Sequence, residues 1–365
     1  MALIKLNTNS LSDNAVTTDK IVNDGNLGNK NLIINGAMTV AQRGTSGTIT
    51  GDNQYPSLDR WATRTYGGTG RFSVAQDTTV PSGQTFTNSL KATVTTTATS
   101  GTYGYSIKHN LEGYTVNKLR TGTSDALKST LSFWARSSVA GTYCCSVRGT
   151  SGAASYVFEY TLAADTWTKI EHTIAEPTTT TPSWDRTNAA DYLFEWSLGG
   201  QTSKQTSTTE SWHDGNYTST SNQTDWIATS GATFYLTGVQ LEVGETATPF
   251  EHEDYGTTLR KCMRYYQLVD GGVGKVTTLN TNVQMMVQAA FDMRATPSLA
   301  VTTLKVTDCT TADYDDATVS IGGANINLRG GRTSLGMSST AAVGTVVMLL
   351  GTGTNAAPVQ LSAEL

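Results

Sequence analysis

The stretch "VQLEVGETATPFEHEDYGTTLRKCMRYYQ", residues 239–267, changes its hydrophobic period halfway along. Its first five residues alternate apolar and polar side chains, which predicts a half-buried strand. Leu259, Cys262, Met263 and Tyr266 then recur at the spacing of a helix stripe. A helix this short is not stable alone in water, so we expect these four residues to dock it onto a domain or against copies of itself.

Upstream of this stretch, short alternating segments separated by turn residues predict a series of strands. They lie at 72–74, 90–94, 131–135, 143–147, 156–162, 192–198 and 234–243. The composition is rich in Thr, Ser, Gly and aromatic residues, which suits pleated, half-buried surfaces. The chain is therefore predicted to be all-β, with a jelly-roll β-sandwich at its centre.

Downstream, apolar residues alternate strictly from Val283 to Met293, which predicts a further strand and a smaller C-terminal β domain. Residues 1–30 are polar and end in a Gly/Asn-rich stretch typical of a linker. The predicted order is thus a separate N-terminal segment at 1–30, the sandwich at 31–255, a connecting helix at 256–270 and the C-terminal domain at 271–365.

The composition argues against several classes of protein. Charged residues make up 15% of the chain and the net charge is −5, which does not suit a nucleic-acid binder. No run of eighteen apolar residues occurs, so no membrane insertion is expected. The four cysteines show no metal-ligand spacing and are predicted to be free, buried thiols.

No catalytic constellation is recognisable. None of the four histidines lies in a nucleophile elbow or a zinc motif, and no metal or other cofactor is expected. Acidic residues cluster at 251–254, close to Glu242, but sequence cannot show the carboxylate separation that a glycosidase needs. Acidic residues in a connection between domains are more often simply solvated.

Two long polar segments carry tryptophans that fall outside the alternating strands. Their aromatic faces would suit the apolar face of a sugar ring, with neighbouring carboxylates bonding its hydroxyls. Two interpretations fit, because these tryptophans either contact a ligand or anchor the long loops onto the sheets. The candidate glycan-binding residues are Trp184, Trp212, Trp226, Asp185, Asp214 and Asp225.

Three stretches resemble a family of tailed-bacteriophage structural proteins. "NLIINGAMTVAQRGTS" at 31–46, with "YPSLDRW" at 55–61, is similar to the opening of a module in that family. Residues 239–267 are similar to its close, and "FDMRATPSLAV" at 291–301 resembles the strand that often follows. The N-terminal "MALIKLNTNSLSDNAVTTDKI" resembles the leader of tail fibres from marine and cyanobacterial phages.

The resemblance implies a tail fibre or fibre-like virion protein whose jelly roll is similar to carbohydrate-binding modules. It implies a homotrimer, assembled on the virion after synthesis in the bacterial cytoplasm. Residues 1–30 would join a phage tail or adaptor protein, and the chain would bind host-surface polysaccharide or lipopolysaccharide without acting as an enzyme. The alternatives are a head fibre or capsid decoration protein with no receptor role, and a depolymerase that uses Glu242 or Glu251.

Overall fold

The computed structural model describes part of the chain in detail. The described residues are 29–98, 101, 103–149, 154–178, 184–269, 272–277, 282–301, 304–307, 313–316, 320–336, 343–344, 346–351 and 359–365. Most of the predicted attachment segment, residues 1–28, and Cys309 lie outside them. No helix in this described part is long and apolar enough to cross a lipid bilayer.

The chain forms two compact units. The first, the sandwich unit, contains Met1–Met38, Thr48–Gln54 and Ala62–His252. The second, the C-terminal unit, contains Thr39–Gly47, Tyr55–Trp61 and Glu253–Leu365. The change between units at residue 252 lies close to the predicted boundary at 255. The two short N-terminal segments of the C-terminal unit were not predicted.

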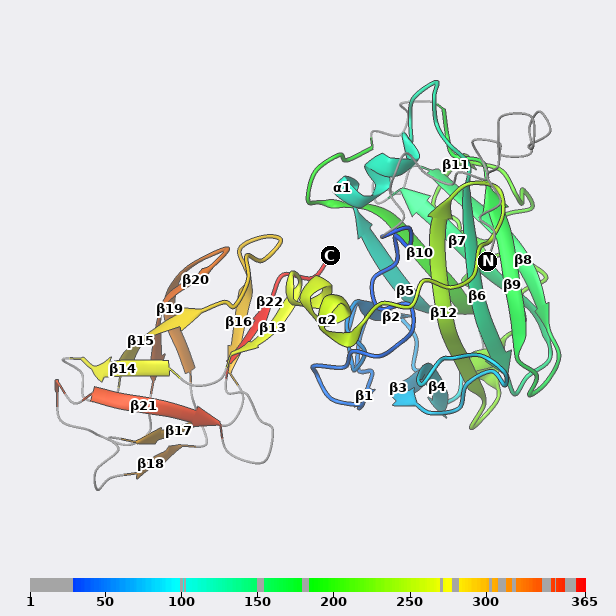
Figure 1. The fold of residues 1–365 in the computed structure, drawn as a ribbon. Coiled ribbons are helices and arrows are strands. Elements are labelled where there is room, and N and C mark those ends of the chain that lie inside the picture. Colours follow the sequence, from blue (N-terminus) through cyan, green and yellow to red (C-terminus); the bar gives the residue numbers. More distant parts are fainter. Residues whose placement is uncertain are drawn as a thin grey trace, which may run out of the picture. The chain divides into compact units, whose positions relative to one another are not determined.

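Two six-stranded antiparallel sheets face each other in the sandwich (Figure 1). The first sheet has the order β1 (Ser46–Thr48), β3 (Arg71–Asp77), β4 (Ser89–Thr96), β12 (Thr233–Val243), β6 (Ser129–Ser137) and β9 (Thr168–Ile174). The second has the order β11 (His213–Asp214), β8 (Ala154–Leu162), β7 (Gly141–Gly149), β10 (Ala190–Gly199), β5 (Gly104–Glu112) and β2 (Trp61–Tyr66). The short helices are α1 (Gly113–Val116), η1 (Asn117–Leu119), η2 (Thr202–Lys204) and η3 (Trp226–Ala228).

The all-β prediction and the jelly-roll sandwich are confirmed, and each predicted strand of the sandwich is present. Aromatic side chains from both sheets meet between them in edge-to-face pairs. Phe133 of the first sheet contacts Tyr160 and Trp196 of the second, at centroid distances of 5.3 Å and 5.8 Å. Such pairs add stability beyond the area that they bury, so alternate residues of each strand fix the core.

The opening motif runs alongside the closing strand β12. Leu32 N donates to Leu241 O over 2.8 Å, and Val239 N donates to Gly36 O over 3.0 Å. The Asn31 side chain also bonds the β12 backbone in both directions. A Cβ at residue 36 would lie 2.0 Å from Val239 O, so this close approach requires glycine. The two motifs are therefore one structural feature of the sandwich.

The described residues of the C-terminal unit form one helix and two sheets. The helix is α2 (Tyr255–Met263). The three-stranded sheet has the order β13 (Tyr266–Val269), β22 (Val359–Ser362) and β16 (Ser298–Val301). The seven-stranded sheet has the order β18 (Asp313–Asp316), β17 (Leu304–Thr307), β21 (Val346–Gly351), β14 (Gly272–Val276), β15 (Asn282–Gln288), β20 (Gly330–Gly336) and β19 (Ser320–Asn327).

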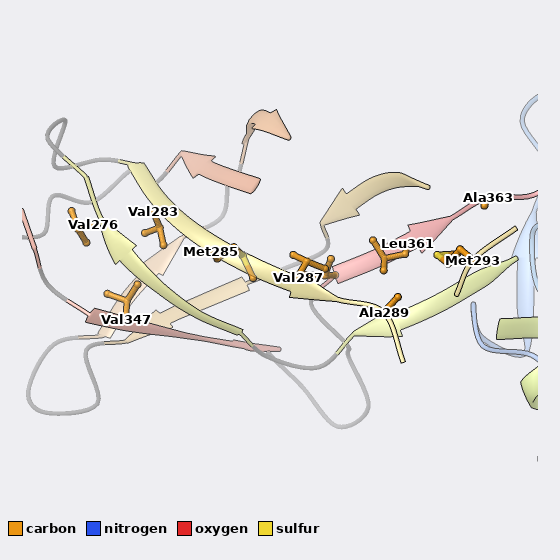
Figure 2. Close-up of a cluster of buried hydrophobic side chains, with 10 residues drawn as sticks. Val276, Val283, Met285, Val287, Ala289, Met293, Val347, Leu361 and Ala363 are labelled. Atoms are coloured by element: carbon orange, nitrogen blue, oxygen red, sulfur yellow. The ribbon is translucent and has the colours of Figure 1, made fainter. Parts of the chain in front are cut away.

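The core of this unit follows the predicted alternation. Val283, Met285 and Val287 of β15 are buried together with Val276 of β14 and Val347 of β21 (Figure 2). The intervening residues of β15 face the opposite side, where Met286 is exposed. The predicted short helix and smaller C-terminal β domain are thus confirmed.

The helix is shorter than predicted. Asp254 caps its N-terminus by accepting from Thr257 N over 3.0 Å, and it ends at Met263. Tyr266 belongs to β13 and pairs with Ser362 of β22, so it is not a helical residue. The apolar spacing continues past the helix end because Tyr266 is buried by sheet pairing. Cys262 is also fully buried, and Leu259 and Met263 are half-buried.

The segments "AQR", "LDRW" and "RYY" meet in the C-terminal unit through their side chains. Arg60 and Arg43 both pair with Glu364, and Arg43 Nη2 lies 3.1 Å from its Oε1. The Arg60 guanidinium lies 3.5 Å from the Tyr265 ring centroid, and that of Arg43 lies 3.6 Å from the Tyr266 centroid. This cluster, the arginine–tyrosine cluster, joins residues far apart in the sequence.

Candidate functional site

Trp226 does not present its ring to solvent. It begins η3, its side chain is 0% exposed, and it packs edge-to-face on Phe72 at 5.9 Å between centroids. A buried ring cannot stack on a sugar, so Trp226 does not fit the predicted ligand-binding role. Its position corresponds to the alternative interpretation, in which the tryptophan anchors a loop onto a sheet.

Trp184 and Trp212 pack on each other. Their ring centroids lie 5.5 Å apart in an edge-to-face arrangement, and each also contacts Tyr192. Trp184 is 8% exposed and Trp212 is half-buried. The cavity beside Trp184 is too narrow for a water molecule. These rings hold the two long polar segments together, and little of their surface is left for a ligand.

The three predicted carboxylates come from separate segments. Asp185 accepts from Thr187 N and Oγ1 in a local turn. Asp214 is an exposed residue of β11, and Asp225 precedes η3 and is partly buried. Their contact with a ligand stays a prediction.

The carboxylates considered for catalysis hold loops of the chain. Glu242 accepts from Thr248 N and Oγ1, over 2.8 Å and 2.6 Å. Glu251 accepts from Asn29 N and Asn31 N, over 2.8 Å and 2.7 Å. Within the described residues, no group of three or more His, Cys, Asp or Glu side chains is arranged to hold a metal ion.

A different set of polar residues gathers on the outer face of the second sheet. Along β10, Tyr192, Phe194 and Trp196 face the core, so Glu195 faces outward. Glu195 lies opposite Lys108 of β5 on one side and Ser146 of β7 on the other. We call this surface the β10 polar face; it comprises Arg64, Ser106, Lys108, Ser146, Arg148 and Glu195.

Glu195 is the centre of this face. It accepts from Ser106 Oγ over 2.6 Å, lies 3.4 Å from Arg64 Nη1 and pairs closely with Arg148. Burial alone would raise the pKa of Glu195, but the attraction of Arg148 and then of Arg64 and Lys108 outweighs it and lowers that pKa to about 2. Glu195 is therefore a permanent anion at neutral pH.

Two loops bring further polar groups to the rim. Asn53 Oδ1 accepts from Lys108 Nζ, and Asn216 Oδ1 accepts from Arg148 Nη1. Lys204 of η2 is half-buried, and the positive charges of Arg148 and Arg64 act on it. The segments 51–54 and 201–219 thus cover most of the β10 polar face. Arg64 and Lys204 stay half-buried at its edge, whereas the other residues of the face are buried.

An exposed aromatic ring lies beside this face. Tyr66 ends β2, its side chain is 50% exposed, and the Arg64 guanidinium lies 5.4 Å from its ring centroid. The exposed ring can pack on the apolar face of a small ring-shaped ligand, while the charged and amide groups bond its hydroxyls. Sequence reasoning missed these residues. The available signal was the position of Glu195 between core-facing aromatic residues.

Comparison with known proteins gives no family. No family model matches the chain, and no curated protein matches it. Solved structures match at low similarity, and three of them are described here. The family 11 carbohydrate-binding module of a cellulosomal cellulase of Clostridium thermocellum has 13% identity and a TM-score of 0.28, covering 56% of this chain and 98% of the module.

The other two are a bacterial and a viral protein. The N-terminal cellulose-binding domain of Cellulomonas fimi β-1,4-glucanase C has 18% identity and a TM-score of 0.29, covering 56% of this chain and 98% of that domain. The enzymatically active domain of tailspike protein 4 of bacteriophage CBA120 has 12% identity and a TM-score of 0.29, covering 54% of this chain but 21% of that one. At this level the likeness carries no argument about function, so the ligand has to be inferred from the chain's own residues.

Proposed function

We propose that this chain is a non-enzymatic virion protein of the tail-fibre type that binds a host-surface glycan on the β10 polar face. The observation that carries the proposal is the exposed Tyr66 ring beside Arg64, at the edge of a face with buried charges and rim amides. An amphipathic ring next to fixed polar groups is the arrangement that a pyranose needs, because the sugar has one apolar face and a belt of hydroxyls.

The virion assignment is supported by the motifs that resemble phage fibre proteins. In the structure these motifs pack together, since the opening motif lies along β12 and its arginines enter the arginine–tyrosine cluster. We propose that residues 1–30 attach the chain to a phage tail or adaptor protein. At the end of that segment, Lys30 Nζ donates to Pro249 O over 2.8 Å and Asn29 N donates to Glu251, which ties the leader to the sandwich unit.

We propose a homotrimer, because several weak sites on one particle increase attachment through avidity. Absence of catalysis is part of the same proposal. It is supported by Glu242 and Glu251, whose oxygens are engaged by backbone and hydroxyl groups of the chain. Incubation of the purified protein with host polysaccharide should release no reducing sugar.

The test is attachment of the fluorescently labelled full chain to a panel of aquatic bacteria, with free lipopolysaccharide from each strain as competitor. Strain-selective labelling that the lipopolysaccharide abolishes is expected. Tyr66→Ala should remove the labelling, whereas Tyr114→Ala, which removes another exposed tyrosine, on α1, should retain it. If no strain is labelled, including the true host, the chain is a structural appendage without a receptor role. If Tyr66→Ala and Tyr114→Ala label equally, the site lies elsewhere.

A further inference from the structure

The β10 polar face has more positive than negative charge. Arg64, Arg148 and Lys108 surround the single carboxylate of Glu195, and Lys204 stands at the rim. Asp52 is the other anion that acts on Lys108. Four cations therefore face two carboxylates, on a chain whose overall charge is −5. The local sign is opposite to that of the whole molecule.

Lys204 responds to this imbalance. Burial first, and then the neighbouring Arg148 and Arg64, lower the pKa of Lys204. Burial also lowers the pKa of Lys108, although the carboxylates of Glu195 and Asp52, the next largest influences, oppose this shift and Arg64 and Arg148 add less to it. Lys204 therefore lies in a positive potential of its neighbours, which a bound anion would relieve.

Hydrogen-bond donors also outnumber acceptors on this face. Both oxygens of Glu195 are used, by Ser106 and Arg64 on one side and by Arg148 on the other. The Nε atoms of Arg64 and Arg148 and the Oγ of Ser146 have no hydrogen-bond partner among the described residues. Ser146 lies directly opposite Glu195 in the strand register, so this unused donor capacity is buried at the centre of the face, behind the half-buried Arg64 and Lys204.

We propose that the β10 polar face selects an acidic sugar, with the ring on Tyr66 and its carboxylate or phosphate directed toward Arg64 and Lys204. This inference rests on the proposed glycan-binding function and narrows it to one ligand class. The hydroxyls of a neutral sugar would form hydrogen bonds with the polar groups of the face, but they would leave its surplus positive charge uncompensated. An acidic sugar meets both requirements, because guanidinium and ammonium groups bind anionic oxygens more strongly than neutral ones.

The test compares three oligosaccharides by calorimetric titration of the full chain. They are a uronic-acid oligosaccharide, its carboxyl-reduced counterpart with the same linkages, and a phosphorylated oligosaccharide of the same length. We expect the carboxyl-reduced form to bind more weakly than at least one acidic form. The difference in affinity between the two acidic forms identifies whether the site prefers a carboxylate or a phosphate. Raising the salt concentration should weaken the binding of the acidic oligosaccharides only.

Lys204→Gln supplies the variant, and Lys128→Gln supplies its matched control. Lys128 is an exposed lysine paired with Glu245, so it reports the loss of one surface charge elsewhere on the sandwich unit. Lys204→Gln should weaken the binding of the acidic oligosaccharide about fivefold and leave the affinity for the carboxyl-reduced oligosaccharide unchanged. Lys128→Gln should change neither. Equal melting temperatures for both variants and the native chain exclude a folding defect.

The possible failures are distinguishable. Binding of the carboxyl-reduced oligosaccharide as tightly as of the acidic forms would overturn this inference and leave glycan binding standing. If Lys204→Gln and Lys128→Gln weakened the binding of the acidic oligosaccharide equally, this inference would also be overturned, because binding would then depend on the net charge of the chain alone. Absence of binding for every oligosaccharide, together with absence of cell labelling, would remove the proposed function itself.

Discussion

At the residue scale, the most consequential side chain is Glu195. Its carboxylate is buried, yet it stays ionised because it pairs with Arg148 and Arg64 and accepts from Ser106. It also fixes the positions of the two guanidinium groups that the proposed ligand would meet. Its charge is therefore both a structural requirement and a determinant of the binding face.

The acid sensitivity of the sandwich unit should depend on Glu195. Because the folded-state pKa of Glu195 is lowered from 4.5 to about 2, its stabilisation is present above pH 4.5 and is lost as the pH falls toward 2. The stability of Glu195→Gln should not show this decrease between pH 4.5 and 2. At pH 7 the substitution should lower the free energy of unfolding by about 3 kcal/mol, because Arg148 and Arg64 lose their ionic partner. Urea titration from pH 2 to 7 measures both effects. Glu171→Gln, in the exposed Lys169–Glu171 pair, is the control and should change little.

Glu176 should show the opposite dependence on pH. Burial raises the pKa of Glu176 to about 7, although hydrogen bonds from Ser129 and Tyr192 partly oppose the shift. A raised carboxyl pKa means that the protonated form is favoured in the folded chain, so its contribution to stability falls as the pH rises from 4.5 to 7. Glu176→Gln should therefore be more stable than the native chain at pH 8, with a smaller difference at pH 4.5. Equal stability of the two chains at both pH values would contradict the shift.

At the element scale, α2 is short and depends on its surroundings. Cys262 is fully buried, whereas Leu259 and Met263 are half-buried. We expect the apolar side chains of Leu259 and Met263 to take part in domain docking or subunit association. Met263→Asp should lower the melting temperature, the molecular mass by light scattering, or both, because a charge would enter an apolar contact. Arg260→Asp changes an exposed residue of the same helix and serves as control. An unchanged mass and melting temperature for Met263→Asp would rule out both roles.

The elements that could be predicted are those with a strong two-residue period. β8, β10 and β12 alternate clearly, because one face of each lies against the aromatic core. β5 was not predicted, since polar residues such as Lys108, His109 and Asn110 occupy buried positions of this strand and interrupt its apolar period. The end of α2 was missed because Tyr266 keeps the helical spacing while it is held in β13 by pairing with β22.

The β10 polar face was not predicted from the sequence. Tryptophans in polar loops were expected to meet a ligand, but Trp226 is in the core, and Trp184 and Trp212 pack on each other. The β10 polar face depends on strand order, which places β5, β10 and β7 side by side. Sequence periodicity shows that Glu195 faces away from the core, but it does not show that Lys108, Arg64 and Arg148 surround it.

At the scale of the whole molecule, the C-terminal unit is held by the arginine–tyrosine cluster. Glu364→Gln should lower the free energy of unfolding of this unit by about 3 kcal/mol, because Arg60 is 1% exposed and would lose its buried partner. Asp292→Asn removes the partner of Arg329 in a pair whose side chains are 56% and 78% exposed, and it should have no measurable effect. Thermal unfolding followed by near-ultraviolet circular dichroism compares the two variants. A similar shift in both would contradict the importance of burial.

The interleaving of the C-terminal unit has a consequence for how such chains can exchange parts by recombination. A crossover near residue 253 would carry Glu364, Tyr265 and Tyr266 into a new chain but leave Arg43 and Arg60 behind. The recipient would have to supply arginines at the corresponding positions of its own opening segment. Successful hybrids are therefore expected to be those in which both parents have the "AQR" and "LDRW" segments, so that a new C-terminal domain can be acquired without new stabilising contacts.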